Sequence, residues 1–247
     1  MSGRESRAVD RDSAHNRCHS KQRDPPSMSA AASLRIVLLG NPGAGKSSSG
    51  NTILGQKAFL SQICTSSVTR GCSEAQATVS GRSVSVVDTP AICYTHTSPD
   101  ELLRSVCLSS PGPHAFLIVF PVNMRFTEQD ERIPQMIELM FGEGVLNYCI
   151  ILFTHGDLLK GKNIEKLIEE NCRLRSVVQQ CGGRYHVFNN RDVNNREQVE
   201  DLLQKIESMI QQNGGGHYTN EMHEDTQKVR EEEKLQEEKP RQTCVCS

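Results

Sequence analysis

The eight residues from Gly40 to Ser47, with the sequence GNPGAGKS, constrain the fold of this chain more than any other segment. They follow an apolar run that predicts a buried strand, and they precede a segment with helical spacing. Glycines at this spacing let the backbone curl so that consecutive N–H groups point toward phosphate oxygens, while the helix N-terminus adds its positive end. Lys46 would reach the β- and γ-phosphates, and the Ser47 hydroxyl would ligate Mg²⁺. The segment predicts a phosphate-binding loop whose contact residues are Gly40, Asn41, Pro42, Gly43, Ala44, Gly45, Lys46, Ser47 and Ser48.

Around this loop, composition divides the chain into three regions. Residues 1–33 lack periodic apolar residues, which predicts disorder, and residues 213–247 form a charged tail that is partly helical or disordered. Between them, residues 34–212 alternate short apolar runs with amphipathic stretches, which predicts an α/β domain with a mostly parallel sheet and helices on both faces. The apolar runs are 34–40, 83–89, 114–120, 148–154 and 184–188. The last helix, from Asn195, should bury one face made of Val199, Leu202, Leu203, Ile206, Met209 and Ile210.

Composition also limits the function classes. A net charge of −2 over 247 residues favours neither nucleic acid nor an anionic membrane as a partner. The polar N-terminus has no apolar stretch typical of a signal peptide, and no apolar run reaches the length of about 18 residues that spans a bilayer. The ten cysteines are scattered singly, without metal-ligand spacing. We therefore expect reduced thiols and a cytoplasmic protein.

The segment VVDTPAI, from Val86 to Ile92, has the form of a nucleotide switch with one altered position. Asp88 ends the next apolar run after the loop, where it would hold Mg²⁺ through a water molecule. The position that is usually glycine in such switches is Ala91. Its backbone N–H can still sense a γ-phosphate, although alanine loses some of the positive-φ freedom of glycine.

Base recognition is expected after the 148–154 run, at THGD, residues 154–157. The Asp157 carboxylate would accept two hydrogen bonds from guanine N1–H and N2–H, donors that adenine does not offer in this arrangement. Thr154 and His155 stand where asparagine and lysine are usual in guanine sites. The alternative is a plain strand-to-helix turn. Asn189 and Asn190, after the last apolar run, are expected in the loop that flanks the base.

These motifs resemble the GTPases of immunity-associated proteins, whose G domain is of the avirulence-induced type. GPHAFLIVFPVNMRFTEQD at 112–130 is similar to the box that this family carries between switch and base motif. SGNTILG at 49–55, VTRGC at 68–72 and FTHGDLL at 153–159 also fit, so the resemblance covers about residues 34–212. It implies a P-loop NTPase with a Ras-like G domain, a mixed six-stranded sheet, GTP and GDP binding with Mg²⁺, and nucleotide-dependent homodimers or oligomers at membranes. It also implies that Thr69 contacts Mg²⁺, beside Ser47 and Asp88.

Catalysis is left open by the sequence. Ras-like hydrolysis uses a glutamine after the switch glycine, and here that position is Ile92, so we expect slow turnover. The family resemblance implies an arginine that completes the site across a dimer, and Arg125 is the matching candidate; the alternative is a surface cation before a helix. The resemblance thus implies a slow GTPase switch, whose GTP-bound form dimerises or oligomerises, in immune or membrane-associated regulation. The alternative is a GTP-loaded assembly scaffold with negligible hydrolysis. A P-loop kinase or ATPase is a more distant alternative.

The last four residues, CVCS, form a prenylation pattern at Cys244. One prenyl group gives only reversible attachment, and the acidic segment before it opposes binding to an anionic surface. Peripheral association with intracellular membranes through Cys244 is therefore expected only if this cysteine is modified.

Overall fold

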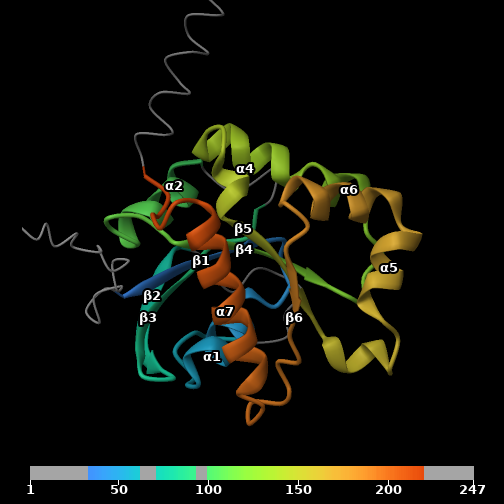
Figure 1. Cartoon of the computed structure of the whole chain (residues 1–247), viewed down its shortest axis with the longest axis horizontal. Helices are drawn as coiled ribbons and strands as arrows, with labels where there is room; N and C mark the ends of the chain where they lie inside the picture. Colours follow the sequence, from blue (N-terminus) through green and yellow to red (C-terminus); the bar gives the residue numbers. More distant parts are fainter. Residues whose placement is uncertain (1–32, 62–70, 93–98, 220–247) are drawn as a thin grey trace, which may run out of the picture. The chain divides into compact units, whose positions relative to one another are not determined.

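The computed structural model describes residues 33–61, 71–92 and 99–219. Within these residues, six strands form one mixed sheet in the order β2-β3-β1-β4-β5-β6 (Figure 1). The strands are β1 (Leu34–Gly40), β2 (Ser73–Val79), β3 (Arg82–Asp88), β4 (Ala115–Pro121), β5 (Cys149–Thr154) and β6 (Tyr185–Val187). All neighbours pair in parallel except β2 and β3, which are antiparallel. The predicted fold class, a Ras-like α/β domain with a mixed six-stranded sheet, is confirmed.

Five of the six strands coincide with the apolar runs of the sequence. The sixth, β2, has no such run because it is an edge strand, in which only Val79 is buried. Its neighbour β3 is covered on both faces and buries every residue from Val84 to Asp88. An edge strand that faces solvent does not need the continuous apolar run of a central parallel strand.

Helices cover both faces of the sheet. They are α1 (Lys46–Leu54), α2 (Pro99–Leu108), α3 (Glu128–Glu131), α4 (Ile133–Phe141), α5 (Ile164–Glu170), α6 (Cys172–Gln180) and α7 (Glu197–Gln212), with short 3₁₀ helices η1 (Val145–Tyr148) and η2 (Gly156–Leu159). Alternate residues of β1 enter two separate cores: Ile36 and Leu38 pack with α1 and α7, whereas Val37 and Leu39 pack with α2 and α4 to α6. Figure 1 shows α1 and α7 together on one face.

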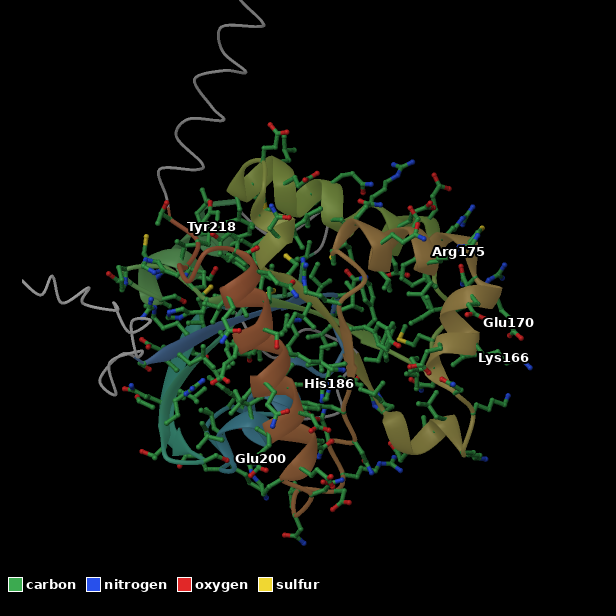
Figure 2. The ribbon with its side chains drawn as sticks, viewed as in Figure 1. Lys166, Glu170, Arg175, His186, Glu200 and Tyr218 are labelled. Carbon is green, nitrogen blue, oxygen red and sulfur yellow. The ribbon has the colours of Figure 1, made fainter. Side chains whose placement is uncertain are left out.

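The last helix, α7, buries the six apolar residues that its spacing predicted. Packing continues beyond it, however, to Tyr218, which is only 1% exposed. The Tyr218 ring lies against Phe116 and Phe141, and its backbone N–H donates to Pro113 O at 2.9 Å. Tyr218 is labelled in Figure 2, at the end of the chain segment that follows α7. The first residues of the expected tail therefore belong to the packed domain.

The parallel strands bring their carboxyl ends to one edge of the sheet. Leu38 pairs with Asp88, Gly40 with Val119, and Pro121 with Thr154, so the ends of β1, β3, β4 and β5 lie side by side. In open α/β sheets, ligands bind at this edge. Among the described residues, no helix combines the length and the hydrophobicity needed to cross a bilayer.

Two buried histidines give the fold a predicted pH dependence. Burial lowers the pKa of both His114 and His186 to about 4. The His114 ring accepts a hydrogen bond from the Arg35 N–H at 3.1 Å, and the His186 ring contacts Gln198 O at 2.7 Å. In the unfolded chain each histidine has a pKa of about 6.5, so the unfolded state takes up protons before the folded state does. The free energy of unfolding is therefore highest above about pH 6.5 and decreases as the pH falls toward 4.

We therefore expect the free energy of unfolding to fall by about 1–2 kcal/mol per histidine between about pH 7 and pH 5. Urea denaturation at the two pH values measures this change. His114→Gln and His186→Gln should each show a smaller drop than the wild type. A wild-type stability that does not change over this range would contradict the prediction.

Candidate functional site

The loop between β1 and α1 has the backbone of a phosphate-binding loop. Gly40 and Gly45 have φ values of 147° and 96°, and Gly45 caps the start of α1. A Cβ at Gly40 would lie 2.7 Å from Val119 O, and one at Gly45 would lie 3.3 Å from Thr154 Cγ2. Only glycine combines these φ values with such close approaches. The loop is therefore held in its curled form by the neighbouring ends of β4 and β5.

Lys46 is folded over this loop. Its Nζ donates to Gly40 O at 3.0 Å and to Asn41 O at 3.1 Å, and the residue is only 7% exposed. An ammonium group carries three N–H donors, so Lys46 can keep both bonds and still donate to a phosphate oxygen. Burial lowers the pKa of Lys46 to about 8, while the Asp88 carboxylate acts in the opposite direction.

This pKa predicts proton uptake when a nucleotide binds. Phosphate charge beside Lys46 favours its protonated form, so its pKa should rise in the complex. Affinity should then decrease about fourfold between about pH 7 and pH 8.5, and binding at pH 8 should take up roughly half a proton. Calorimetry of GDP binding in buffers of different ionisation enthalpy measures the uptake. Binding at pH 8 without proton uptake would contradict this prediction.

Ser47 and Asp88 lie together at the start of α1. The Ser47 hydroxyl donates to Asp88 Oδ2 at 2.6 Å, and Asp88 is only 1% exposed. Hydroxyl and carboxylate oxygens suit Mg²⁺, which binds few protein ligands and keeps waters and substrate phosphates in its octahedral shell. Within the described ranges, no group of three or more His, Cys, Asp or Glu residues could hold a metal. The pair therefore fits a Mg²⁺ shared with phosphates. The third expected ligand, Thr69, lies outside the described residues.

The altered switch starts beside the phosphate loop. The Ile92 N–H donates to Gly40 O at 3.0 Å, and the Thr89 hydroxyl donates to Leu38 O at 2.6 Å. Both Ala91 and Ile92 are buried, at 5% and 1% exposure. The Ile92 side chain belongs to the core that also contains Val37. Ile92 therefore offers neither a polar group nor an exposed side chain to a water molecule.

Thr154 and His155 are the first two residues of the THGD segment, 154–157, and Thr154 connects this segment to the phosphate loop. Thr154 is fully buried, and its hydroxyl donates to Ala44 O at 2.7 Å, so this residue ties the motif to the phosphate loop. His155 adopts φ 59°, a conformation uncommon for a residue with a side chain, and its Nδ1 lies 3.0 Å from the Thr154 hydroxyl. The structure thus assigns Thr154 a contact with loop backbone.

Asp157 is positioned by η2 and keeps one carboxylate oxygen open to hydrogen bonding. Oδ2 lies 3.1 Å from Arg191 Nη1, and the Arg191 side chain is largely exposed. Oδ1 is buried and has no hydrogen-bond partner among the residues that the structure describes. A buried carboxylate oxygen without a donor costs free energy, so a ligand N–H at this position would be stabilising.

The loop after β6 is fixed by contacts of Asn190 with α1 and by Gln198, a residue that the sequence patterns did not single out. Asn190 accepts from Thr52 at 2.8 Å and donates to Ser49 at 3.1 Å, so its side chain binds α1. Gln198, at the start of α7, accepts from the Asn189 N–H at 2.9 Å and donates to Asn189 O at 3.2 Å. No local sequence signal marks Gln198, because its partners are known only from the fold. The loop is thus held against α1.

Two cavities flank these groups. One, of about 740 Å³, is lined by Ser48, Asn51, Thr52, Phe59 and Asn190, among other residues. Its volume lies within the usual range for a small-molecule site, and it borders the loop expected to flank the base. The other, of about 210 Å³, lies between the phosphate loop and the segment after β4, and it includes Asn41, Pro42 and Arg125. Arg125 is exposed at its rim.

Comparisons with known proteins agree with this geometry. The model of the AIG1 family matches residues 34–239. The chain belongs to the AIG1 family. An Arabidopsis thaliana relative, immune-associated nucleotide-binding protein 10, is 34% identical, over 83% of this chain and 48% of its own length. Human GTPase IMAP family member 8 is 35% identical, over 76% of this chain and 29% of its own. The chain therefore spans half or less of these two curated relatives.

Solved structures of Toc33 from Arabidopsis thaliana share the fold of this AIG1-family domain. One, in complex with GDP and Mg²⁺, has a TM-score of 0.53 at 17% identity and covers 72% of this chain and 84% of its own. A second, with a TM-score of 0.54 at 16% identity and 72% and 82% coverage, is described by the finding that dimerisation is important for the GTPase activity of atToc33 and psToc159. At these identities, the likeness shows a common G-domain fold.

Proposed function

We propose that this chain binds GTP and GDP with Mg²⁺ and acts as a slow GTPase switch. The observation that carries the proposal is the buried Oδ1 of Asp157, which has no donor among the described residues and lies in the motif that Thr154 ties to the phosphate loop. Guanine offers N1–H and N2–H donors to such a carboxylate, and adenine does not. Lys46 binds phosphate oxygens, and Ser47 and Asp88 hold the metal.

Hydrolysis by a single molecule is expected to be slow. The buried Ile92 replaces the water-orienting glutamine of Ras-like sites, so the rate should be that of an unassisted switch, roughly 10⁻⁴ to 10⁻³ s⁻¹. Acceleration then requires a group supplied from outside the site. Arg125 is exposed beside the phosphate loop, where a second copy of the chain can receive it. The dimer dependence described for Toc33 supports this arrangement by analogy of fold.

Single-turnover hydrolysis of GTP at increasing protein concentration tests this function. The rate should rise with concentration in the wild type, and Arg125→Ala should remove the rise while leaving GTP affinity nearly unchanged, because a transition-state contact adds little to ground-state binding. The loss should be about 1,000-fold or more if Arg125 contributes as much as other arginines supplied in trans. Arg132→Ala, an exposed arginine seven residues along the chain, is the matched control and should retain the rise. If the rate still rises with protein concentration in Arg125→Ala, then Arg125 is not the group that accelerates hydrolysis in the dimer.

A GTP-loaded scaffold is the second candidate, supported by the buried Ile92. A scaffold should assemble with GTP and still hydrolyse it at the slow rate at every concentration. The name of the Arabidopsis thaliana relative, immune-associated nucleotide-binding protein 10, supports a role in immune regulation.

A further inference from the structure

One hydrogen bond connects the phosphate loop to the segment that carries Arg125. Asn41 Nδ2 donates to Asp130 Oδ1 at 2.7 Å, although the two residues are 89 positions apart. Asn41 is also bound through its backbone, since its carbonyl accepts from Lys46 Nζ at 3.1 Å. The residue that contacts Asp130 therefore shares a hydrogen-bond network with the lysine expected at the phosphates.

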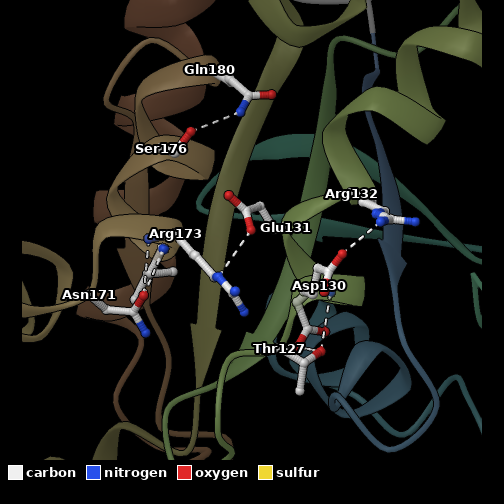
Figure 3. Close-up of polar contacts among 10 residues, drawn as sticks. Thr127, Asp130, Glu131, Arg132, Asn171, Arg173, Ser176 and Gln180 are labelled. Carbon is white, nitrogen blue, oxygen red and sulfur yellow. Dashed lines mark hydrogen bonds and ion pairs between the residues drawn. The ribbon is translucent and has the colours of Figure 1, made fainter.

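The second oxygen of Asp130 holds the chain close to Arg125. Oδ2 accepts from the Thr127 N–H at 2.8 Å and from the Thr127 hydroxyl at 2.7 Å. The Asp130 N–H donates back to the Thr127 hydroxyl at 3.4 Å, which completes a reciprocal capping box at the start of α3. Figure 3 shows these contacts between Thr127 and Asp130. Thr127 lies two residues after Arg125.

Other polar contacts of α3 are weaker attachments. Glu128 pairs with Arg132 at 2.7 Å within the same segment, and both side chains are 63% exposed. Glu131 reaches Arg173 of α6 at 3.3 Å, as Figure 3 shows, but this pair is also partly exposed. Exposed ion pairs of this kind contribute little to stability. They join α3 to itself and to α6, whereas Asp130 joins it to the phosphate loop.

We infer that Asp130 is a positioning residue that holds the Arg125 segment at a fixed place relative to the phosphate loop. Its two carboxylate oxygens act on different partners, so one side chain links the loop backbone around Asn41 to the turn at Thr127. The position of Arg125 then follows the position of the phosphate loop. This inference rests on the proposed function for the role of Arg125, but the link itself is a property of the single chain.

Limited trypsin digestion measures the link without any hydrolysis of GTP. Detachment of the segment should make the bond after Arg125 more accessible to trypsin, and mass spectrometry identifies the fragment. In the GDP-loaded protein, Asp130→Ala should raise the rate of this cut by about fivefold or more, because local opening becomes easier. Asn41→Ala should also raise it, and the double variant should cut little faster than Asp130→Ala, because both changes remove the same bond. Glu128→Gln, which removes a neighbouring exposed carboxylate, should leave the cut unchanged.

Two outcomes of the digestion would overturn the inference. If Asn41→Ala cuts at the wild-type rate while Asp130→Ala cuts faster, then the capping box alone holds the segment. If the effects of the two variants simply add, then Asn41 and Asp130 act independently. Asp130→Asn keeps one acceptor oxygen, which can serve Asn41, but it replaces the oxygen that accepts from Thr127 by an NH2 group, so it should restore only part of the protection.

Hydrolysis then separates the link from the proposed function. Asp130→Ala should lose about tenfold or more of the concentration-dependent acceleration while GTP affinity changes less than about threefold. Asp130→Asn should recover part of the loss, because it keeps the acceptor for Asn41. An Asp130→Ala protein that keeps the full acceleration would overturn the positioning role. If hydrolysis by the wild type does not accelerate with protein concentration but the digestion follows the expected pattern, then Asp130 does hold the segment to the phosphate loop. In that case only the role proposed for Arg125 is wrong.

Discussion

Lys46→Ala is expected to weaken GDP and GTP binding by about 100-fold or more. The variant loses a charge-assisted hydrogen bond to phosphate, and a factor of 100 corresponds to about 2.8 kcal/mol. It also loses the bonds from Nζ to Gly40 O and Asn41 O, so the loop becomes less well ordered before a ligand arrives. Calorimetric titration with GDP measures the effect.

The matched control is Lys166→Ala, which removes the same charge from α5, where the lysine is 76% exposed and labelled in Figure 2. Its affinity for GDP should equal that of the wild type. Thermal unfolding of the nucleotide-free variants separates loss of binding from loss of fold. Wild-type affinity in Lys46→Ala would remove this lysine from the nucleotide site.

Asp157→Asn is expected to change the preferred base from guanine to xanthine. The amide can donate to the carbonyl that xanthine carries at C2, whereas it cannot accept both N–H donors of guanine. Affinity for GTP should fall by about 100-fold, since hydrogen bonds to a charged group contribute roughly 1.5–3 kcal/mol each, and affinity for XTP should rise. Competition between the two nucleotides measures the ratio directly.

Arg191→Gln is the control for this change, because it breaks the same ion pair but keeps the Asp157 carboxylate. Arg191 is 76% exposed, and an exposed pair contributes at most about 1 kcal/mol, so GTP should remain preferred. If Asp157→Asn retains the wild-type preference for GTP over XTP, then another residue reads the base.

Local patterns predicted the parts of this structure that local chemistry determines. A phosphate-binding loop needs small residues and a lysine at fixed spacing, so Gly40, Gly45 and Lys46 could be read from the chain. The four central strands β3, β1, β4 and β5 are covered on both faces, so they appear as apolar runs. The amphipathic face of α7 follows from its periodicity in the same way.

Other parts depend on contacts between distant segments and leave no local pattern. The edge strand β2 faces solvent, so its residues do not form an apolar run. Asp130 acquires its role from a side chain 89 positions away, and Gln198 acquires its role from backbone groups of the loop after β6, whose position is set by the fold. Tyr218 follows a glycine-rich stretch that suggested a tail, yet its ring is buried against Phe116 and Phe141.

Titration of the wild-type chain with GDP and with ADP, both in the presence of Mg²⁺, is the most direct test of guanine-nucleotide binding at Asp157. GDP should bind about 100-fold more tightly than ADP or better, because only guanine offers two donors to the Asp157 carboxylate, whose Oδ1 is buried. Equal affinities for the two nucleotides, or no binding of either, would contradict a guanine site in this protein.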